Sequence, residues 1–341
     1  MATTNRTTKA RIAAQLAALC ALIALGPALG CSCKPEPSPK APPVTMAVGM
    51  LPLTSLAIIA DHERLFSREG VAVTVKKCAT GVIAMDALLA GEVQVAVAGD
   101  TPVVFGSFKR RDFRIVTGVA SWDNDVTIVA RKDRGIVRPV DLKGRRIATQ
   151  RTSVAQFFLH MFLLKHGLSE KDVTICSMPQ AEFPQAMVRG DVDASSIREP
   201  FTSQAISLLG TNAVTFEEPG LYVEYYNLVA SDRFLKERPD AVRRIVRALL
   251  AAETFAKNKP QRAMAIVART ISMPEPTLRR LWPRLDLRVR LSQSLLVALE
   301  DQARWAIGEH VAEGTTMPNF LRFIHLDTML AEKPSAVSII R

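Results

Sequence analysis

Two spacings of apolar residues alternate along the chain from about Thr45 onward. Short runs with an apolar residue at every second position are typical of strands, and longer runs with apolar residues three and four positions apart are typical of helices. Residues 71–75 show the first spacing, and residues 56–66 show the second. Gly91 directly follows the predicted helix 82–90, and Gly70 lies four residues after the predicted helix 56–66; glycine commonly marks the end of a helix. Strands that alternate with helices predict βαβ units on a largely parallel sheet.

Two such series follow one another, the first up to about residue 130 and the second from Asp141. Beyond Tyr226 one more strand is predicted, and the rest of the chain is dominated by predicted helices. The predicted strands are 45–48, 71–75, 93–97, 114–119, 127–130, 146–148, 173–176, 192–195 and 227–230. The predicted helices are 56–66, 82–90, one that begins at Asp100, 153–165, 183–189, 200–209, 239–256, 261–269, 275–281 and 293–309. The pattern therefore predicts two α/β lobes.

The first 30 residues differ from the rest of the chain. Arg6, Lys9 and Arg11 precede an almost wholly apolar stretch at residues 12–29. A basic start and a short apolar core are typical of a secretory signal, and the stretch is short for a membrane span. We therefore expect residues 1–30 to be a signal peptide and the protein to be exported.

Ala28-Leu29-Gly30-Cys31 resembles the bacterial lipobox. The resemblance implies cleavage before Cys31 and a lipid on its thiol, which would anchor the protein to a membrane at the periplasm or cell surface. Residues 31–44 are rich in proline and poor in core-forming residues, a composition typical of an extended tether. An ordinary signal peptide followed by an incidental cysteine is the alternative.

Composition and charge narrow the range of possible functions. The 341 residues suffice for two domains, and a hydrophobic content of 48% is ordinary for a globular protein. Loss of residues 1–30 would lower the formal net charge from +11 to +8. Apart from the short runs at 109–111 and 143–146 the basic residues are scattered, so a nucleic-acid partner is not expected. A basic surface suits an anionic membrane or anionic solutes.

The chain shows no pattern of a catalytic or metal site. Its five cysteines have no CxxC or Cys/His spacing, so we expect neither a metal site nor a disulfide framework. No nucleophile elbow, HExxH motif or phosphate-binding loop is present. We therefore expect a protein without cofactor that is not an enzyme.

Seven local patterns carry a family resemblance. They are LFSREG (65–70), LLAGEV (88–93), AGDTP (98–102), DLKGRRIA (141–148), HGL (166–168), GDVDA with EPF (190–194 and 199–201) and FLKERP (234–239). In order and spacing they resemble the nitrate/sulfonate/taurine-type solute-binding proteins of ABC importers, a branch of the type II periplasmic-binding fold. The resemblance implies two lobes, each a mostly parallel sheet flanked by helices, joined by two hinge strands around a ligand cleft. We expect the first lobe at 45–130 and 226–341 and the second at 131–225.

Ligands of open parallel sheets bind at the carboxyl ends of strands, where helix starts offer free amides. In the first lobe, the residues at such positions are Leu53, Thr54, Ser55, Thr80, Gly99, Asp100 and Thr101. Trp122 and Tyr226 are further candidates, because they lie near the two hinges. The hydroxyl and carboxyl side chains could equally be helix caps. Trp122 and Tyr226 could equally be core residues.

In the second lobe, the candidates are Arg151, Thr152, Ser153, Arg198 and Glu199. Ser153 and Gln156 have the spacing of a capping box, and the hydroxyls and amides there could hold an oxyanion. The family usually has glycine where Thr152 stands and often an aromatic residue where Arg198 stands. The Arg198 guanidinium could bind an anionic ligand or pair with Glu199, and Glu199 could bind a ligand amine or cap the helix at Pro200.

The sequence therefore predicts a monomeric receptor of an ABC importer that binds a small anionic solute of the sulfonate, nitrate or taurine type. Its expected partners are the permease with its ATPase. A lipid-anchored sensor is one alternative, because transport and sensing both require only closure around a ligand. An enzyme of pyrimidine or thiamine-precursor metabolism on the same fold is another, although the cysteine cluster of those relatives is missing.

Overall fold

The computed structural model describes residues 42–123 and 125–340. The described residues from 43 onward form one compact unit. The predicted signal peptide, Cys31 and residues 31–41 of the predicted tether lie outside the described residues. The first strand begins at Val44, the last residue of the predicted tether.

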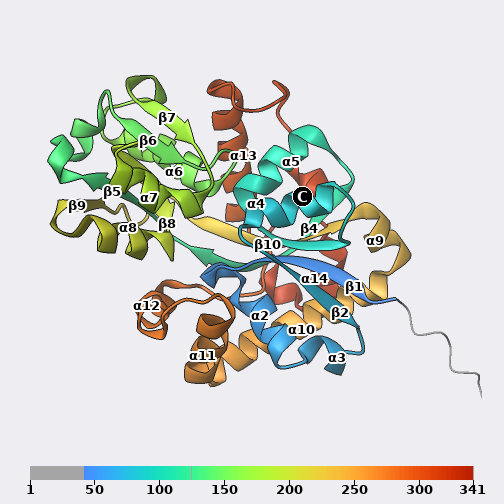
Figure 1. The fold of residues 1–341 in the computed structure, drawn as a ribbon. Coiled ribbons are helices and arrows are strands. Elements are labelled where there is room, and N and C mark those ends of the chain that lie inside the picture. Colours follow the sequence, from blue (N-terminus) through green and yellow to red (C-terminus); the bar gives the residue numbers. More distant parts are fainter. Residues whose placement is uncertain (1–41, 124, 341) are drawn as a thin grey trace, which may run out of the picture. The chain divides into compact units, whose positions relative to one another are not determined.

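The first sheet contains β1 (Val44–Gly49), β2 (Val73–Cys78), β3 (Val95–Gly99), β4 (Phe113–Trp122) and β10 (Glu224–Ser231), in the spatial order β2-β1-β3-β10-β4 (Figure 1). β1 runs parallel to β2 and β3. β10 runs antiparallel to its neighbours β3 and β4. One reversed strand thus lies within an otherwise parallel sheet.

The second sheet repeats this arrangement. It contains β5 (Val126–Arg131), β6 (Arg146–Thr149), β7 (Thr174–Ser177), β8 (Ala194–Arg198) and β9 (Ala213–Phe216), in the order β7-β6-β8-β5-β9. β6 is parallel to β7 and β8, whereas β5 is antiparallel to β8 and β9. The prediction of two α/β lobes is confirmed.

Helices cover both faces of each sheet. On the first sheet, α4 (Gly81–Leu89) and α5 (Asp100–Lys109) lie on one face, and α2 (Ser55–His62), α3 (Leu65–Arg68), α10 (Pro239–Asn258) and α14 (Leu326–Glu332) lie on the other (Figure 1). The second sheet carries α6 (Val154–Lys165), α7 (Phe183–Arg189) and α8 (Phe201–Leu209). The remaining helices are α9 (Asp232–Glu237), α11 (Pro260–Thr270), α12 (Glu275–Leu281) and α13 (Gln293–Gly308).

Apolar residues at consecutive strand positions explain why the second sheet is covered on both faces. Ile128 and Ile147 belong to the core under α6, whereas their neighbours Val129 and Ala148 belong to the core under α7 and α8. Successive side chains of a strand point to opposite faces. Strands that are apolar at consecutive positions must therefore be buried on both sides.

The chain passes between the two sheets twice. It leaves β4 at Trp122 and enters β5 at Val126, and it returns between Phe216 of β9 and Glu224 of β10. The first crossing comes before the expected boundary at residue 130, because β5 pairs with strands of the second lobe. The expected return at residue 226 falls inside β10. An apolar run does not reveal which sheet it will join, so the sequence placed these boundaries only approximately.

An aromatic cluster also joins the lobes. Phe105 of α5 and Phe157 of α6 pack against Trp305 of α13, with ring centroids 5.8 Å and 5.2 Å from the tryptophan. The Trp305 indole N–H donates a hydrogen bond to Oε1 of Glu170 (3.0 Å). Helix α13 of the C-terminal segment thus contacts both lobes.

The first predicted helix and the strand predicted at 192–195 are among the elements whose bounds differ in the structure. The helix expected at 56–66 is broken into α2 and α3, because Arg64 adopts a left-handed conformation with φ of 55°. The strand expected at 192–195 is β8, which lies two to three residues further on and ends at Arg198. Arg198 is therefore a strand residue.

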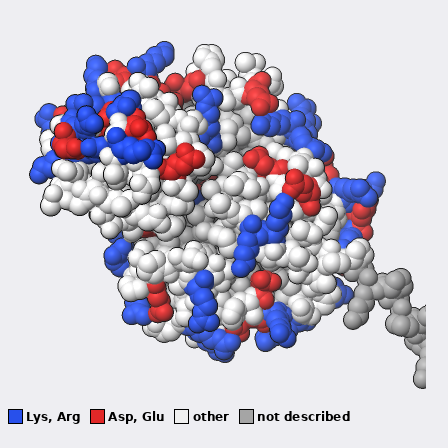
Figure 2. All heavy atoms as spheres, in the orientation of Figure 1, with Lys and Arg blue, Asp and Glu red and all other residues white. Residues whose placement is uncertain are grey.

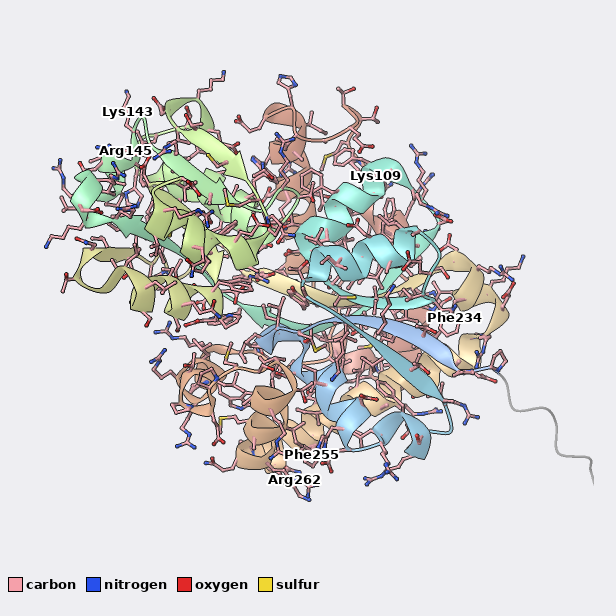
Figure 3. The ribbon with its side chains drawn as sticks, viewed as in Figure 1. Lys109, Lys143, Arg145, Phe234, Phe255 and Arg262 are labelled. Carbon is pink, nitrogen blue, oxygen red and sulfur yellow. The ribbon has the colours of Figure 1, made fainter. Side chains whose placement is uncertain are left out.

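The two basic runs noted in the sequence do not form one patch. Lys109 lies on α5, whereas Lys143 and Arg145 lie on the second lobe (Figure 3). Lys109 pairs with Glu313 at 3.3 Å and Lys143 with Asp172 at 3.5 Å. Figure 2 shows positive and negative side chains interspersed over one face. Such a surface does not resemble a nucleic-acid interface.

No helix within residues 42–123 and 125–340 combines the length and the apolar character needed to cross a bilayer. Cys78 and Cys176 have free thiols and lie in different lobes. The described part of the chain contains no cluster of three or more His, Cys, Asp or Glu side chains that could hold a metal ion.

Candidate functional site

A small cavity lies between the two lobes, beside the crossings. It is lined by Leu51, Thr80, Gly81, Val82, Gly99 and Pro102 of the first lobe, by Gln150, Ser153, Val154, Gln180 and Arg198 of the second, and by Glu224 and Tyr226 of β10. Its volume of about 20 Å³ has room for roughly one water molecule. The lobes are therefore closed on each other, and a larger ligand enters only if they separate.

Glycine allows the close approach of the first-lobe strand ends. A Cβ atom at Gly81, the first residue of α4, would lie 2.8 Å from the Tyr226 hydroxyl and 3.2 Å from the Gly99 amide nitrogen. A Cβ atom at Gly99 would lie 3.3 Å from Oε1 of Glu224. Thr80 precedes α4 and its hydroxyl accepts a hydrogen bond from the Ile83 amide (3.3 Å), so this side chain caps the helix.

Arg198 forms the centre of a buried charge cluster at the cavity. Its guanidinium makes ion pairs with Asp125 and Glu224 and donates a hydrogen bond to the Tyr226 hydroxyl (3.2 Å). The side chains of Arg198, Asp125 and Glu224 are only 6%, 4% and 2% exposed. Asp125 belongs to the first crossing and Glu224 begins β10. The cluster therefore joins a second-lobe strand to both hinge connections.

The two carboxylates compete for one cation. Burial raises the pKa of Glu224 well above its ordinary value; Arg198 opposes this shift, and the nearby Asp125 adds to it. Neither sequence interpretation of Arg198 included these partners, and the alternative pairing with Glu199 is wrong. The Glu199 carboxylate instead accepts hydrogen bonds from the amide (3.1 Å) and hydroxyl (2.7 Å) of Ser203 on α8.

Asp100 lies behind the cavity at the start of α5 and is fully buried. Its carboxylate accepts hydrogen bonds from the Tyr222 hydroxyl, the Tyr225 amide (3.1 Å) and the Thr101 amide (2.8 Å). Burial nevertheless raises the pKa of Asp100 to about 6. Asp100 thus fastens the returning hinge segment to the first lobe.

The start of α6 is built differently from the predicted capping box. Ser153 lines the cavity, but its hydroxyl donates to the Gln150 carbonyl (2.7 Å) and does not cap the helix. The Gln156 side chain accepts a hydrogen bond from the amide of Thr152 (3.0 Å). Thr152 has φ of 56°, a left-handed conformation that favours glycine.

Several other predicted residues do not line the cavity. The Thr54 hydroxyl donates to the carbonyls of Gly49 (2.6 Å) and Leu51 (2.8 Å), and the Ser55 hydroxyl donates to the Pro52 carbonyl (2.5 Å). Both side chains therefore stabilise the turn after β1. The predicted site residues that do not line the cavity are Leu53, Thr54, Ser55, Asp100, Thr101, Trp122, Arg151, Thr152 and Glu199.

The cavity brings together Thr80, Gly99, Ser153, Arg198 and Tyr226 of the predicted set. Sequence reasoning missed Gln150, Gln180 and Glu224. Gln150 directly follows β6, so the rule that ligands bind at strand ends could have found it. The predicted bounds of β10 began at Asn227, which left Glu224 outside any element.

Two lobes joined by two crossings, with a small cavity between them, define a protein of the periplasmic-binding-protein fold. The chain matches the family model described as NMT1/THI5 like over residues 54–263, more than half its length, and belongs to that family.

Relatives of known name support this assignment. The chain is 28% identical over 196 residues to a Bacillus subtilis (strain 168) protein provisionally named for binding aliphatic sulfonates, a match to 57% of this chain and 59% of the relative. It is 26% identical over 145 residues to the taurine-binding periplasmic protein of Escherichia coli (strain K12), covering 42% of this chain and 45% of the relative. The match thus covers less than two thirds of these relatives.

Solved structures show the same fold over a longer span. The alkanesulfonate-binding protein SsuA from Xanthomonas axonopodis pv. citri has a TM-score of 0.70 and 24% identity, covering 82% of this chain and 97% of its own. The desulfurization enzyme DSZB has a TM-score of 0.63 and 15% identity, covering 86% of this chain and 99% of its own. Since binding proteins and an enzyme share it, the fold alone does not decide the function.

Proposed function

We propose that this chain is the extracytoplasmic solute-binding receptor of an ABC importer. The observation that carries the proposal is the cavity between the lobes, which is lined from both lobes and lies beside both crossings. A pair of crossings can act as a hinge, so that the lobes close around a ligand. Relatives named as sulfonate- or taurine-binding proteins support a small solute and a periplasmic location.

Binding is favoured over catalysis by the chemistry of the lining. The described residues around the cavity offer hydroxyls, amides and one arginine–carboxylate cluster, and none of them is a cysteine, histidine or lysine. Hydroxyls and amides fix the orientation of a ligand. We therefore propose a monomeric receptor that releases its solute unchanged to a permease with an attached ATPase.

The solute should contact the cavity residues from both lobes. We propose Thr80, Gly99, Ser153, Arg198 and Tyr226 as contacts, and we add Gln150, Gln180 and Glu224 because they line the same cavity. The other predicted residues would act indirectly, by holding the turns and hinge segments in place.

A screen of thermal unfolding tests the receptor function. A ligand that binds only the folded protein stabilises it by RT ln(1 + [L]/Kd), so a cognate solute raises the midpoint temperature. Gly81→Ala places a methyl group against the Tyr226 hydroxyl and should abolish the shift. Gly308→Ala, with no atom within 4 Å of the added carbon, is the matched control and should retain it. A solute that stabilises all three proteins equally would contradict the proposed site.

Transport and sensing are separated by uptake. Deletion of the gene should abolish uptake of the stabilising solute by the cell if the protein supplies a permease. Unchanged uptake, with loss of a response to the solute, would favour the alternative of a lipid-anchored sensor.

We further propose that Cys31 is the lipidated first residue of the mature protein. The proposal rests on the lipobox-like Ala28-Leu29-Gly30-Cys31 and on the proline-rich residues after it. A single acyl chain anchors a protein only marginally, so at least two chains are expected. Intact-mass measurement of the membrane fraction should show a diacylglyceryl-modified Cys31, and an unmodified terminus elsewhere would refute it.

A further inference from the structure

The charge balance of the cavity differs from that of an oxyanion site. Arg198 is the one basic side chain among the described residues that line it. Asp125 and Glu224 both pair with this arginine, so two carboxyl groups face one positive side chain. Asp100 adds a third carboxyl group behind Glu224, on the partners Tyr222 and Tyr225. An anion entering the cavity would therefore meet an arginine that is already neutralised.

The hydrogen-bonding groups of the cavity also differ from those expected of an oxyanion site. A sulfonate offers only acceptors, whereas the cavity presents acceptors in the Glu224 carboxyl group and the Gln150 side-chain oxygen, in addition to donors such as the side-chain amides of Gln150 and Gln180. Oε1 of Gln150 is buried without a hydrogen-bond partner, and so is Nε of Arg198. One unpaired acceptor and one unpaired donor match a ligand that carries both kinds of group. Buried polar groups without partners are costly, so such a ligand would be favoured.

We infer, on the basis of the proposed receptor function, that the cleft selects a small uncharged or cationic solute with N–H donors, such as an amide or an amidine, and rejects oxyanions. The N–H groups of the solute would donate to Glu224 and to Oε1 of Gln150. An acceptor atom of the solute, where present, would accept a hydrogen bond from the Nε–H group of Arg198.

Rejection of oxyanions follows from the same groups. A sulfonate that displaced Glu224 from Arg198 would leave a buried carboxylate unpaired beside Asp125. Like charges held close together in a desolvated site disfavour the wrong ligand strongly. The relatives' sulfonate and taurine binding would then not extend to this chain, although the fold is shared.

Matched probes of similar size test the inference. Ethanesulfonate, propionamide and propionamidinium differ mainly in charge and hydrogen-bonding pattern. Each is added at about 10 mM to the purified protein, and the midpoint of thermal unfolding is measured. A probe present at ten times its Kd should raise the midpoint temperature of unfolding by about 2–4 °C. We expect propionamidinium or propionamide to give such a shift and ethanesulfonate to give none.

A variant of Glu224 tests whether this residue binds the solute. Glu224→Gln removes the carboxyl group that would pair, in its ionised form, with propionamidinium, and should weaken this probe about ten- to a hundredfold, as expected for loss of a charged hydrogen bond. Its effect on propionamide should be smaller. Glu237→Gln, at an exposed ion pair with Arg233, is the matched control and should leave both probes unaffected.

The outcomes separate the inference from the receptor function. Binding of ethanesulfonate in preference to both nitrogen compounds would overturn the inference and leave the receptor function standing. No shift with any of the three probes would also overturn it, and the receptor function would then depend on the wider solute screen. Equal effects of Glu224→Gln and Glu237→Gln on propionamidinium would refute the role of Glu224.

Discussion

Arg198 looks like an anion-binding residue in the sequence but connects the two lobes in the structure. In the sequence it is a strand-end arginine suited to an anion. In the structure its guanidinium is held by Asp125, Glu224 and Tyr226. The residue therefore connects the lobes before any ligand arrives, and its removal should affect stability first.

Arg198→Ala should lower the free energy of unfolding by about 3–5 kcal/mol, because two buried carboxylates lose their cation. The midpoint and slope of a urea unfolding curve measure this change. Arg233→Ala removes an exposed arginine paired with Glu237 and should cost less than about 1 kcal/mol. Similar losses in the two variants would mean that the Arg198 cluster does not stabilise the fold.

Thr152 is a β-branched residue in a left-handed conformation. Thr152→Gly should raise the free energy of unfolding by up to about 1 kcal/mol, since glycine avoids a strain of about 1–2 kcal/mol but loses more backbone entropy. Thr174→Gly in strand β7, where the backbone is extended, should instead lower it by about 0.5–1 kcal/mol. Chemical unfolding of both variants tests this, and a loss in both would show that Thr152 is not strained.

The raised pKa of Asp100 predicts that the stability of the protein depends on pH. Its folded-state pKa of about 6 exceeds the usual unfolded value of about 3.9, so the folded protein binds the proton more tightly. The resulting stabilisation is complete below about pH 4 and is lost as the pH rises through 6, a change of about 3 kcal/mol. The stability of the wild type relative to Asp100→Asn should therefore fall between pH 4 and pH 7. A difference that stays constant would contradict the raised pKa.

At the scale of elements, apolar spacing located most helices and strands of the described chain. Helices α7 and α12 have the predicted bounds, because glycine or proline marks one of their ends and apolar spacing runs between. The spacing failed at Arg64, where a left-handed residue breaks a helix without interrupting the apolar pattern. It also missed β9, which is only partly buried and has no clear alternation.

The candidate site was predicted less well than the fold. Helix starts were located correctly, but hydroxyls such as those of Thr54 and Ser55 bond to nearby carbonyls. Asp125 and Glu224 were missed, because their partner Arg198 is far away in sequence. Local patterns report helix caps and turns, whereas ion pairs between lobes depend on tertiary packing that a single sequence does not display.

The pairing of β4 with the C-terminal segment depends on Gly118. Its amide donates to the Arg290 carbonyl (2.9 Å), and a Cβ atom there would lie 2.8 Å from that oxygen. Gly118→Ala should therefore lower the free energy of unfolding by about 1–3 kcal/mol through overpacking. Gly308→Ala, at the end of α13 with open space around it, should raise it by about 0.5–1 kcal/mol. Opposite shifts of the two thermal midpoints are expected, and equal shifts would refute the close contact at Gly118.

At the scale of the whole molecule, closure of the lobes is the property on which the proposed function depends. The cavity of about 20 Å³ leaves no space for a solute larger than water. The ion-pair cluster at Arg198 and the aromatic cluster at Trp305 both hold the lobes together. Ligand exchange therefore requires both contacts to open, and a bound solute would strengthen the closed state in proportion to its differential affinity.

Small-angle X-ray scattering with and without a stabilising solute tests this account most directly. Without solute, the lobes should open part of the time, so the radius of gyration should exceed that calculated for the closed structure. Saturating solute should reduce the radius to the closed value, and Gly81→Ala should show no reduction. A radius that is the same with and without bound solute would contradict a receptor that closes around its ligand.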